Sequence, residues 1–159
     1  IFIGYAIGTA PIIGFHYGAK NESELKSIFK KSMNLNLIAG IVLALIGLLF
    51  SRMLAELFVG YDPELCEMTI KGFRIYTISF LFCGFNIFGS SLFTALSNGL
   101  VSAVISFLRT LLFQVAAILI MPLIWGLDGI WYSVAVAEVV ALILTMTFVI
   151  KLKDKYRYM

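Results

Sequence analysis

The sequence predicts an all-α protein, a polytopic bundle of five transmembrane helices. Of its 159 residues, 61% are hydrophobic and 13% are charged, whereas a soluble domain is about 45–50% apolar and about a quarter charged. The mean hydropathy is +1.00. Five stretches have, or nearly have, the roughly 20 apolar residues that a helix needs to cross the hydrocarbon core. Only a helix satisfies its own backbone polar groups in lipid without closing into a barrel.

The five apolar stretches are separated by short polar connections. They cover residues 1–18, 33–50, 73–96, 101–125 and 129–150, and a basic tail follows at 151–159. The runs are continuous, whereas strands of a membrane barrel alternate apolar and polar residues. The chain starts with IFIGYAIG, without Met or a basic n-region. This start is not that of a signal peptide, and we expect the chain to be a fragment that begins inside an apolar segment.

The first span contains four glycines and a proline. Gly4 and Gly8, like Gly14 and Gly18, are four residues apart, so each pair lies on one helix face, where another helix can approach closely. Pro11 lies between the pairs and removes a backbone hydrogen bond, which is expected to bend the helix. Two interpretations stay open: tight packing alone, or a bend that lines a cavity or moves during a functional cycle.

Two polar connections contain helix-start signals. In NESELKSIFKKS, Asn21 is followed three residues later by Glu24, the pattern of a capping box. This segment is either an amphipathic helix at the cytoplasmic interface or an early start of the second span. In YDPEL, Asp62 is the expected N-cap of the third helix and Pro63 its first residue. The third helix therefore begins before its apolar part, which starts near Phe73.

The basic residues predict how the bundle is oriented. Eight of them follow the first and last spans: Lys20, Lys26, Lys30, Lys31, Lys151, Lys153, Lys155 and Arg157. Only three basic residues lie between the second and third spans, in the connection or at its edge, and none in the last two connections. The positive-inside rule then selects a cytoplasmic C-terminus, in a multi-pass protein of the inner (plasma) membrane. The net charge of +3 fits anionic membrane surfaces better than nucleic acid.

Charged groups inside the last two spans are the main functional candidates. Arg109 interrupts the run SFLRTLLFQVAAILIMPLIWG, and Glu138 lies within the fifth span. At 1.5 Å per residue, Arg109 lies roughly 12 Å and Glu138 about 17 Å from the inner face, so their depths differ by about 5 Å. An unpaired charge at mid-bilayer costs at least ~2.5–3.5 kcal/mol, which favours a pair or a polar cavity.

Two interpretations of this pair stay open. It is either a structural ion pair, with Arg109 reaching toward the cytoplasmic face, or part of a polar network whose protonation or opening accompanies function. Glu138 is the group that titrates in the second case, because an arginine keeps its proton. Burial raises the pKa of a carboxyl group, whereas a neighbouring guanidinium lowers it.

Other polar residues complete the candidate set. Gln114 lies about 20 Å from the inner face, and Asn86 either contacts an ion or ligand or forms a helix–helix hydrogen bond. Cys66 and Cys83 make neither a metal-ligand spacing nor a disulfide framework, and His16 has no neighbouring metal ligand. The sequence has no nucleophile–base pair, metal cluster or phosphate loop, so we expect neither an enzyme nor a bound cofactor or metal.

Four motifs, taken together, resemble the multidrug and toxic compound extrusion (MATE) family, most closely its bacterial members. They are PIIGFHYGAKN (11–21), DPEL (62–65), FTALSNGLVSAVISFLRTLLFQ (93–114) and PLIWGLDGIWYSVAVAE (122–138). The resemblance implies a secondary transporter of twelve helices in two six-helix bundles. Such a transporter exports organic, often cationic, compounds in exchange for H⁺ or Na⁺ by alternating access. The chain would match helices 8–12, with the lipid bilayer, the N-terminal bundle and small organic substrates as partners.

The sequence also departs from the family pattern. Some members couple transport through an acidic residue of the first helix, and others through carboxylates of the C-terminal bundle, one of them on the helix that matches 73–96. The apolar part of that helix has no carboxylate here, and Asn86 is its nearest polar residue, so a sodium site of this kind is not expected. Arg109 and Glu138 match positions that recur in the last two helices of the family.

Two alternatives to a multidrug transporter stay open. A lipid-linked oligosaccharide flippase of similar architecture is expected to line its cavity with more cations than Arg109 alone. A non-transporting membrane scaffold needs no polar groups buried at matching depths on successive helices.

Overall fold

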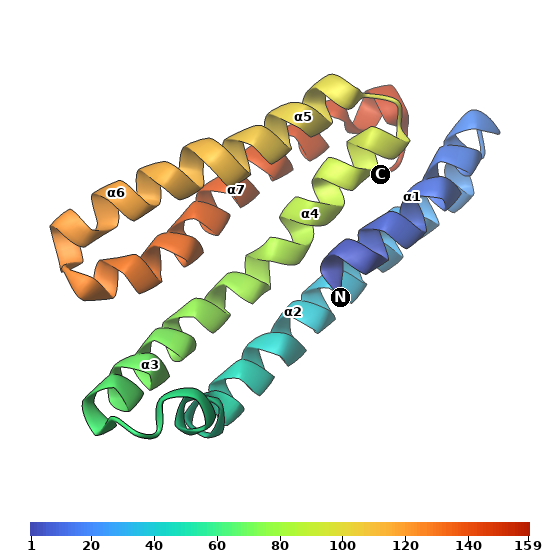
Figure 1. Ribbon diagram of the computed structural model, residues 1–159. Helices are drawn as coiled ribbons and strands as arrows, with labels where there is room; N and C mark the ends of the chain where they lie inside the picture. Colours follow the sequence, from blue (N-terminus) through green and yellow to red (C-terminus); the bar gives the residue numbers. More distant parts are fainter.

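The computed structural model describes residues 1–159, and all of its regular structure is helical. Five antiparallel rods follow one another (Figure 1). They are α1 (Phe2–Gly18), α2 (Glu22–Val59), α3 (Pro63–Tyr76) continued by α4 (Phe80–Ala95), α5 (Gly99–Phe107) continued by α6 (Gln114–Trp125), and α7 (Leu127–Tyr156). Four of the rods, all except α1, are long and apolar enough to cross a membrane. The predicted all-α bundle of five helices is confirmed.

The helix α4 lies at the centre of the bundle. It contacts α1 and α2 on one side and α5 and α7 on the other, and Figure 1 shows this order of the rods. The second rod, α2, is longer than the predicted span 33–50 and begins at Glu22. The segment after the first span is therefore an early start of the second rod, rather than a separate amphipathic helix.

The predicted helix starts are present, with one difference. Asp62 Oδ1 accepts hydrogen bonds from the backbone N–H groups of Glu64 and Leu65, at 3.0 and 3.1 Å, and α3 begins at Pro63 as expected. Asn21 Oδ1 accepts from the Glu24 backbone N–H at 3.3 Å. The reciprocal half of the capping box is not formed, because the Asn21 N–H donates to the His16 carbonyl instead.

Close helix contacts involve glycines other than those of the first span. A Cβ at Gly4, Gly8 or Gly18 would meet nothing within 4 Å, and one at Gly14 would meet only the Ala95 carbonyl oxygen, at 3.4 Å. Apart from this contact, the glycine face of α1 approaches no other helix of this chain. The helix itself continues through Pro11 without a break.

The close contacts are made by glycines of α2 and α4. A Cβ at Gly40 would lie 2.8 Å from the Phe80 carbonyl oxygen, and one at Gly84 would lie 2.8 Å from Asn36 Oδ1. A Cβ at Gly89 would overlap a side-chain carbon of α7. These positions let α4 approach both α2 and α7, because a glycine places no side chain between two helices.

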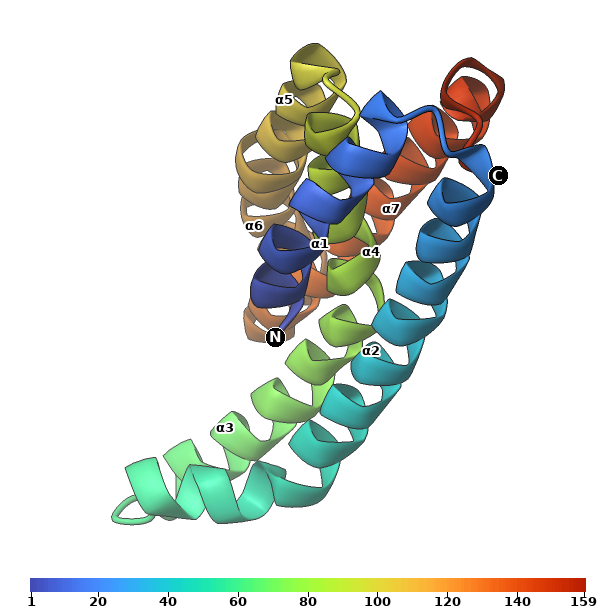
Figure 2. The ribbon, with the colours of Figure 1, turned by 90° about the vertical axis from the view of Figure 1, so that its right-hand side faces the viewer.

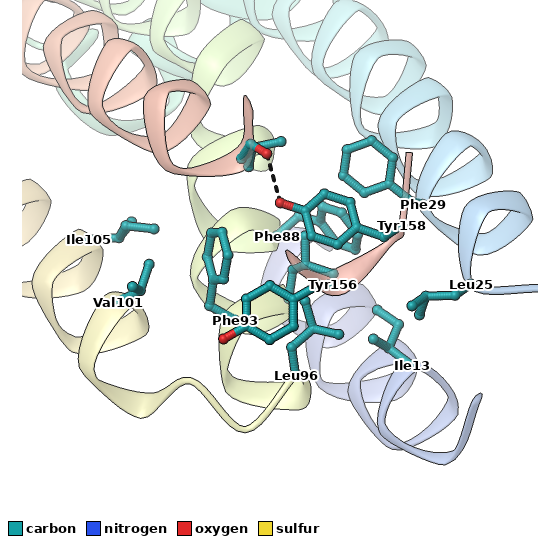
Figure 3. Close-up of a cluster of buried hydrophobic side chains, with 12 residues drawn as sticks. Ile13, Leu25, Phe29, Phe88, Phe93, Leu96, Val101, Ile105, Tyr156 and Tyr158 are labelled. Carbon is teal, nitrogen blue, oxygen red and sulfur yellow. Dashed lines mark hydrogen bonds between the residues drawn. The ribbon is translucent and has the colours of Figure 1, made fainter. Parts of the chain in front are cut away.

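The C-terminal residues fold back onto the bundle. The helix α7 continues to Tyr156, beyond the predicted span 129–150, and Arg157 turns the chain with a φ of 54°. Tyr158 is fully buried against Phe29, and its hydroxyl donates to the Val149 carbonyl at 2.7 Å (Figure 3). Burial raises the pKa of Tyr158 above its ordinary range, so this phenol stays protonated. The basic tail is thus anchored to the core.

Candidate functional site: a buried ion pair beside a cavity

The structure brings Arg109 and Glu138 together between the fourth and fifth rods. Arg109 Nη2 donates to Glu138 Oε1 at 2.7 Å, and Arg109 Nε donates to both carboxylate oxygens, at 3.0 and 3.1 Å. Arg109 Nη2 also donates to the sulfur of the Cys83 thiol, at 3.3 Å. A fork of donors facing both oxygens of a carboxylate is the strong form of this interaction.

Asn86 supplies a second set of donors to Glu138. Its side-chain Nδ2 donates to Glu138 Oε2 at 2.7 Å and to the Glu138 backbone carbonyl at 3.0 Å. Asn86 is fully buried, and its Oδ1 has no hydrogen-bond partner. An unpaired buried acceptor costs about 1–3 kcal/mol. The side chain of Asn86 thus donates to Glu138 through Nδ2 while its Oδ1 is left without a donor.

The surroundings explain why the two charges need each other. The side chain of Glu138 is 8% exposed and that of Arg109 is 21% exposed. Removing a charge from water costs several kcal/mol, which only good geometry and additional hydrogen bonds offset. The carboxylate therefore depends on Arg109 and Asn86 together, and losing either partner would leave a buried charge incompletely satisfied.

Two segments that are not α-helical flank this site. Leu108–Phe113 forms a π-helical turn that contains Arg109, and Thr77–Ser79 forms a 3₁₀ turn between α3 and α4. In the 3₁₀ turn, the Thr77 and Ser79 hydroxyls donate to the carbonyls three residues earlier, at 3.0 and 2.7 Å. Short π segments are frequent at functional sites, and irregular backbone at membrane depth is tolerated where it lines a cavity.

A cavity of about 350 Å³ opens beside the ion pair. Its wall comes from the end of α3, the 3₁₀ turn, α4, the π turn, α6 and α7: Tyr76, Ser79, Phe80, Cys83, Arg109, Thr110, Gln114, Val134 and Glu138. The wall combines one carboxylate and one guanidinium with hydroxyl, amide, thiol and aromatic groups. Such a wall offers a cation the carboxylate of Glu138, and it offers an organic molecule the aromatic faces.

All four residues predicted for a substrate or ion pathway lie at this site. Arg109, Glu138 and Gln114 line the cavity, and Asn86 lies behind it and bonds to Glu138. Gln114 makes no hydrogen bond to the other three, so the cavity alone relates it to them. The pathway role of the four residues stays a prediction.

The contribution of the third rod to the cavity wall was not predicted from the sequence. Tyr76, Ser79 and Cys83 line the cavity and are spaced by three and four residues, in line with Asn86 three residues later. This spacing places the four residues on one helix face. The spacing is visible in the sequence, but Cys83 was assigned there to neither a metal site nor a disulfide, and its thiol is free in the structure. The π turn at Arg109 had no comparable signal.

A line of hydroxyl groups leads from this region toward the α4–α5 turn. Ser90 Oγ lies 2.6 Å from Ser106 Oγ and 3.0 Å from Ser102 Oγ, which in turn lies 2.6 Å from Thr94 Oγ1. Thr110, one helical turn beyond Ser106, lines the cavity and donates to the Ser106 carbonyl. The hydroxyls join α4 to α5, and they also form a polar strip between the cavity and the end of the bundle.

Comparisons with known proteins give one consistent family. The family model for MatE matches residues 1–124. The chain is 24% identical over 167 aligned positions to a protein named "Probable multidrug resistance protein YoeA" from Bacillus subtilis (strain 168). This alignment covers 98% of the chain and 35% of the relative, so the chain spans about a third of that protein's length.

A solved structure shares the fold of the chain. It is described as the inward-facing conformation of a multidrug resistance MATE family transporter of the MOP superfamily. The superposition has a TM-score of 0.88 at 21% sequence identity, and it covers 98% of this chain and 36% of the other. The arrangement of the five rods is therefore one that also occurs within a longer transporter.

Proposed function

The chain belongs to the MATE family of transporters, and from this premise we propose that it is part of a cation-coupled antiporter that exports organic compounds, often cationic ones. Family membership and four apolar helices indicate a multi-pass membrane protein. Within the proposed transporter, the chain supplies five helices of the C-terminal bundle. The N-terminal bundle and the remaining helix complete the path, and coupling uses H⁺ or Na⁺.

The observation that carries this proposal is the carboxylate of Glu138 in the wall of the cavity, paired with Arg109. Glu138 is the acidic residue of that wall, and an intramembrane ionisable residue is a functional candidate by default. A proton, a sodium ion or a cationic substrate at the carboxylate competes with the guanidinium for the same two oxygens. Binding of any of these cations in the cavity would therefore weaken the contact between the π turn and α7. Coupling of ion movement to substrate movement requires a binding event that changes the conformation in this way.

The hydroxyl strip supports a route for the coupling ion. Ser90 and Ser106 continue the polar surface from the cavity toward the α4–α5 turn. In the proposed orientation, the protein lies in the inner (plasma) membrane and its C-terminus is cytoplasmic. The α4–α5 turn then lies on the cytoplasmic side. A route of this kind gives Glu138 access to one compartment at a time, as alternating access demands.

The polar contacts also bear on the alternatives. A membrane scaffold needs no charged pair buried at matching depths, whereas this chain orders Arg109, Asn86 and Glu138 into one network. A flippase for lipid-linked oligosaccharides requires several cations in the cavity, and Arg109 is the cation of this cavity wall. Both comparisons favour the antiporter.

The test uses the longer transporter that carries this chain, reconstituted in proteoliposomes. A fluorescent organic cation should leave the lipid vesicles when a proton or a sodium gradient is applied, and separate gradients identify the coupling ion. Glu138→Gln should lower this efflux about tenfold or more, as expected for loss of a group needed in the transport step. Glu24→Gln, which removes an exposed carboxylate far from the cavity, should leave efflux unchanged.

Folding and transport are separated by measuring the thermal unfolding of each variant before reconstitution. Efflux by Glu138→Gln that equals the wild-type rate in both gradients and across pH would contradict the coupling role. The chain by itself should give no efflux, because the proposed path needs both bundles. Efflux from the chain alone, at the rate of the longer protein, would contradict the proposed division of the transporter.

A further inference from the structure

A second cavity lies at the end of the bundle where the chain folds back. It has a volume of about 270 Å³ and is formed by the end of α1, the start of α2 and the end of α7. Figure 2 shows the C-terminus beside the α1–α2 connection, at the opposite end of the molecule from the α2–α3 connection. The cavity is thus separate from the Arg109–Glu138 site.

The wall of this cavity is predominantly cationic. Lys20, Lys155 and Arg157 line it, together with one carboxylate, that of Glu22. Arg157 Nη1 donates to Glu22 Oε1 at 2.7 Å, which uses one of the five N–H donors of the guanidinium. Lys20 and Lys155 form no ion pair, so two ammonium groups and the rest of the guanidinium stay free for another anion.

A buried nitrogen in the same wall has no partner. His16 Nδ1 is shielded from solvent and forms no hydrogen bond, although His16 lines the cavity. Buried polar atoms in native proteins are almost always hydrogen-bonded, and an orphan of this kind indicates a bound water or ligand. His16 therefore adds a fourth polar side chain to the wall that the cations line.

Apolar surface adjoins the cationic groups. The rings of Tyr17 and Tyr156 form part of the cavity wall, with centroids 5.7 Å apart. On α1, Ile12 is 49% exposed and Phe15 is 71% exposed, just before His16. An anion carried on an apolar molecule would contact both kinds of surface, whereas a free inorganic anion would use the cations alone.

We propose that this cavity binds the phosphate of an anionic phospholipid headgroup. The phosphate oxygens accept hydrogen bonds from Lys20, Lys155 and Arg157, and the acyl chains lie against the exposed apolar face of α1. Basic pockets between helices at a membrane surface recognise such headgroups. A bound phosphate also joins the α1–α2 connection to the end of α7 and so stabilises the C-terminal fold-back. This inference does not depend on the transported compound or on the coupling ion.

The experiment measures lipid binding to the purified chain in neutral detergent by native mass spectrometry. Phosphatidylglycerol should bind in a saturable manner, and zwitterionic phosphatidylcholine should not. The double variant Lys20→Gln/Lys155→Gln should bind phosphatidylglycerol about tenfold more weakly, since each cation near a headgroup contributes on the order of a few-fold in affinity. Surface substitutions of this kind leave the fold intact, which circular dichroism checks.

The matched control is Lys30→Gln/Lys31→Gln. It removes the same charge from α2 near the same end of the bundle, at positions that do not line the cavity, and it should change the affinity by about twofold at most, because charges a Debye length away are screened. An equal loss in both double variants would overturn the proposal, as would equal binding of phosphatidylcholine. Inorganic phosphate that displaces phosphatidylglycerol at equal concentration would overturn the lipid as the source of the anion.

Discussion

Two arginine–glutamate pairs in this protein have the same separation and different surroundings. The pairs Arg109–Glu138 and Arg157–Glu22 both have an N–O distance of 2.7 Å. The side chains of the first pair are 21% and 8% exposed, and those of the second are 68% and 46% exposed. The first pair joins the π turn to α7 inside the bundle. The second joins the start of α2 to the residue after α7, at the surface of the bundle.

The difference shows that the surroundings, and not the distance, decide what an ion pair contributes. Two buried charges cannot exchange their partner for water, so breaking the pair exposes the full desolvation cost of the charge that remains. The groups of the exposed pair exchange their partner for water and salt ions, so such a pair contributes little to stability. We therefore expect large effects at the first pair and small ones at the second.

The largest expected effect comes from Glu138→Gln. The substitution leaves the Arg109 guanidinium buried without a counter-charge, and we expect the free energy of unfolding to fall by about 3–5 kcal/mol. Unfolding in detergent, followed by far-UV circular dichroism, measures this change.

A double substitution sharpens the comparison. Arg109→Met/Glu138→Leu removes both charges and replaces them with apolar groups of similar size, so its stability should return to within about 1.5 kcal/mol of the wild type. The losses of Arg109→Met alone and Glu138→Leu alone would simply add in this double variant if the charges did not interact. Additive losses would contradict the description of Arg109 and Glu138 as one unit.

The second largest effect is expected at Tyr158, close to the exposed pair. Tyr158→Ala removes a fully buried ring and should lower stability by about 3 kcal/mol, whereas Tyr158→Phe removes only the hydrogen bond to the Val149 carbonyl and should lower it by about 1 kcal/mol. Thermal unfolding of the two variants separates ring packing from hydrogen bonding. Equal losses in both variants would show that the hydroxyl, rather than the ring, anchors the tail.

The smallest effect is expected for Glu22→Gln. The exposed carboxylate gives up its pair with Arg157 and its favourable position in the first turn of α2, and the loss of stability should be close to the error of the unfolding measurement. High salt should reduce the difference from the wild type further, because surface charges are screened. A salt-independent loss as large as that of Glu138→Gln would remove the contrast between the two regions.

The helices and their starts could be predicted from local sequence. Long apolar runs give the rods, and Asp62 followed by Pro63 gives the start of α3. The end of the last rod could not be predicted in this way. Lys151, Lys153 and Lys155 mark an end by charge, yet α7 continues to Tyr156, because Tyr158 folds back onto Phe29 and holds the last turn against the core.

The candidate site was predicted in part. Similar depths along antiparallel helices were sufficient to bring Arg109 and Glu138 together, and an amide side chain inside an apolar run was sufficient to single out Asn86. The cavity wall of Tyr76, Ser79 and the π turn depends on how the third and fourth rods face α7. A hydropathy pattern gives the depth of a residue but not the rotation of its helix.

The sequence by itself determined that the chain is a bundle of apolar helices and which few polar groups lie at its centre. These properties follow from the cost of leaving peptide groups and charges unsatisfied in hydrocarbon, which each segment meets alone. Only the tertiary structure decided that Asn86 joins the ion pair, that Gly40 and Gly84 rather than Gly4 and Gly8 allow the close contacts, and that the tail is anchored. Each of these depends on two segments meeting in a particular rotation and register, and side-chain packing between rods fixes both.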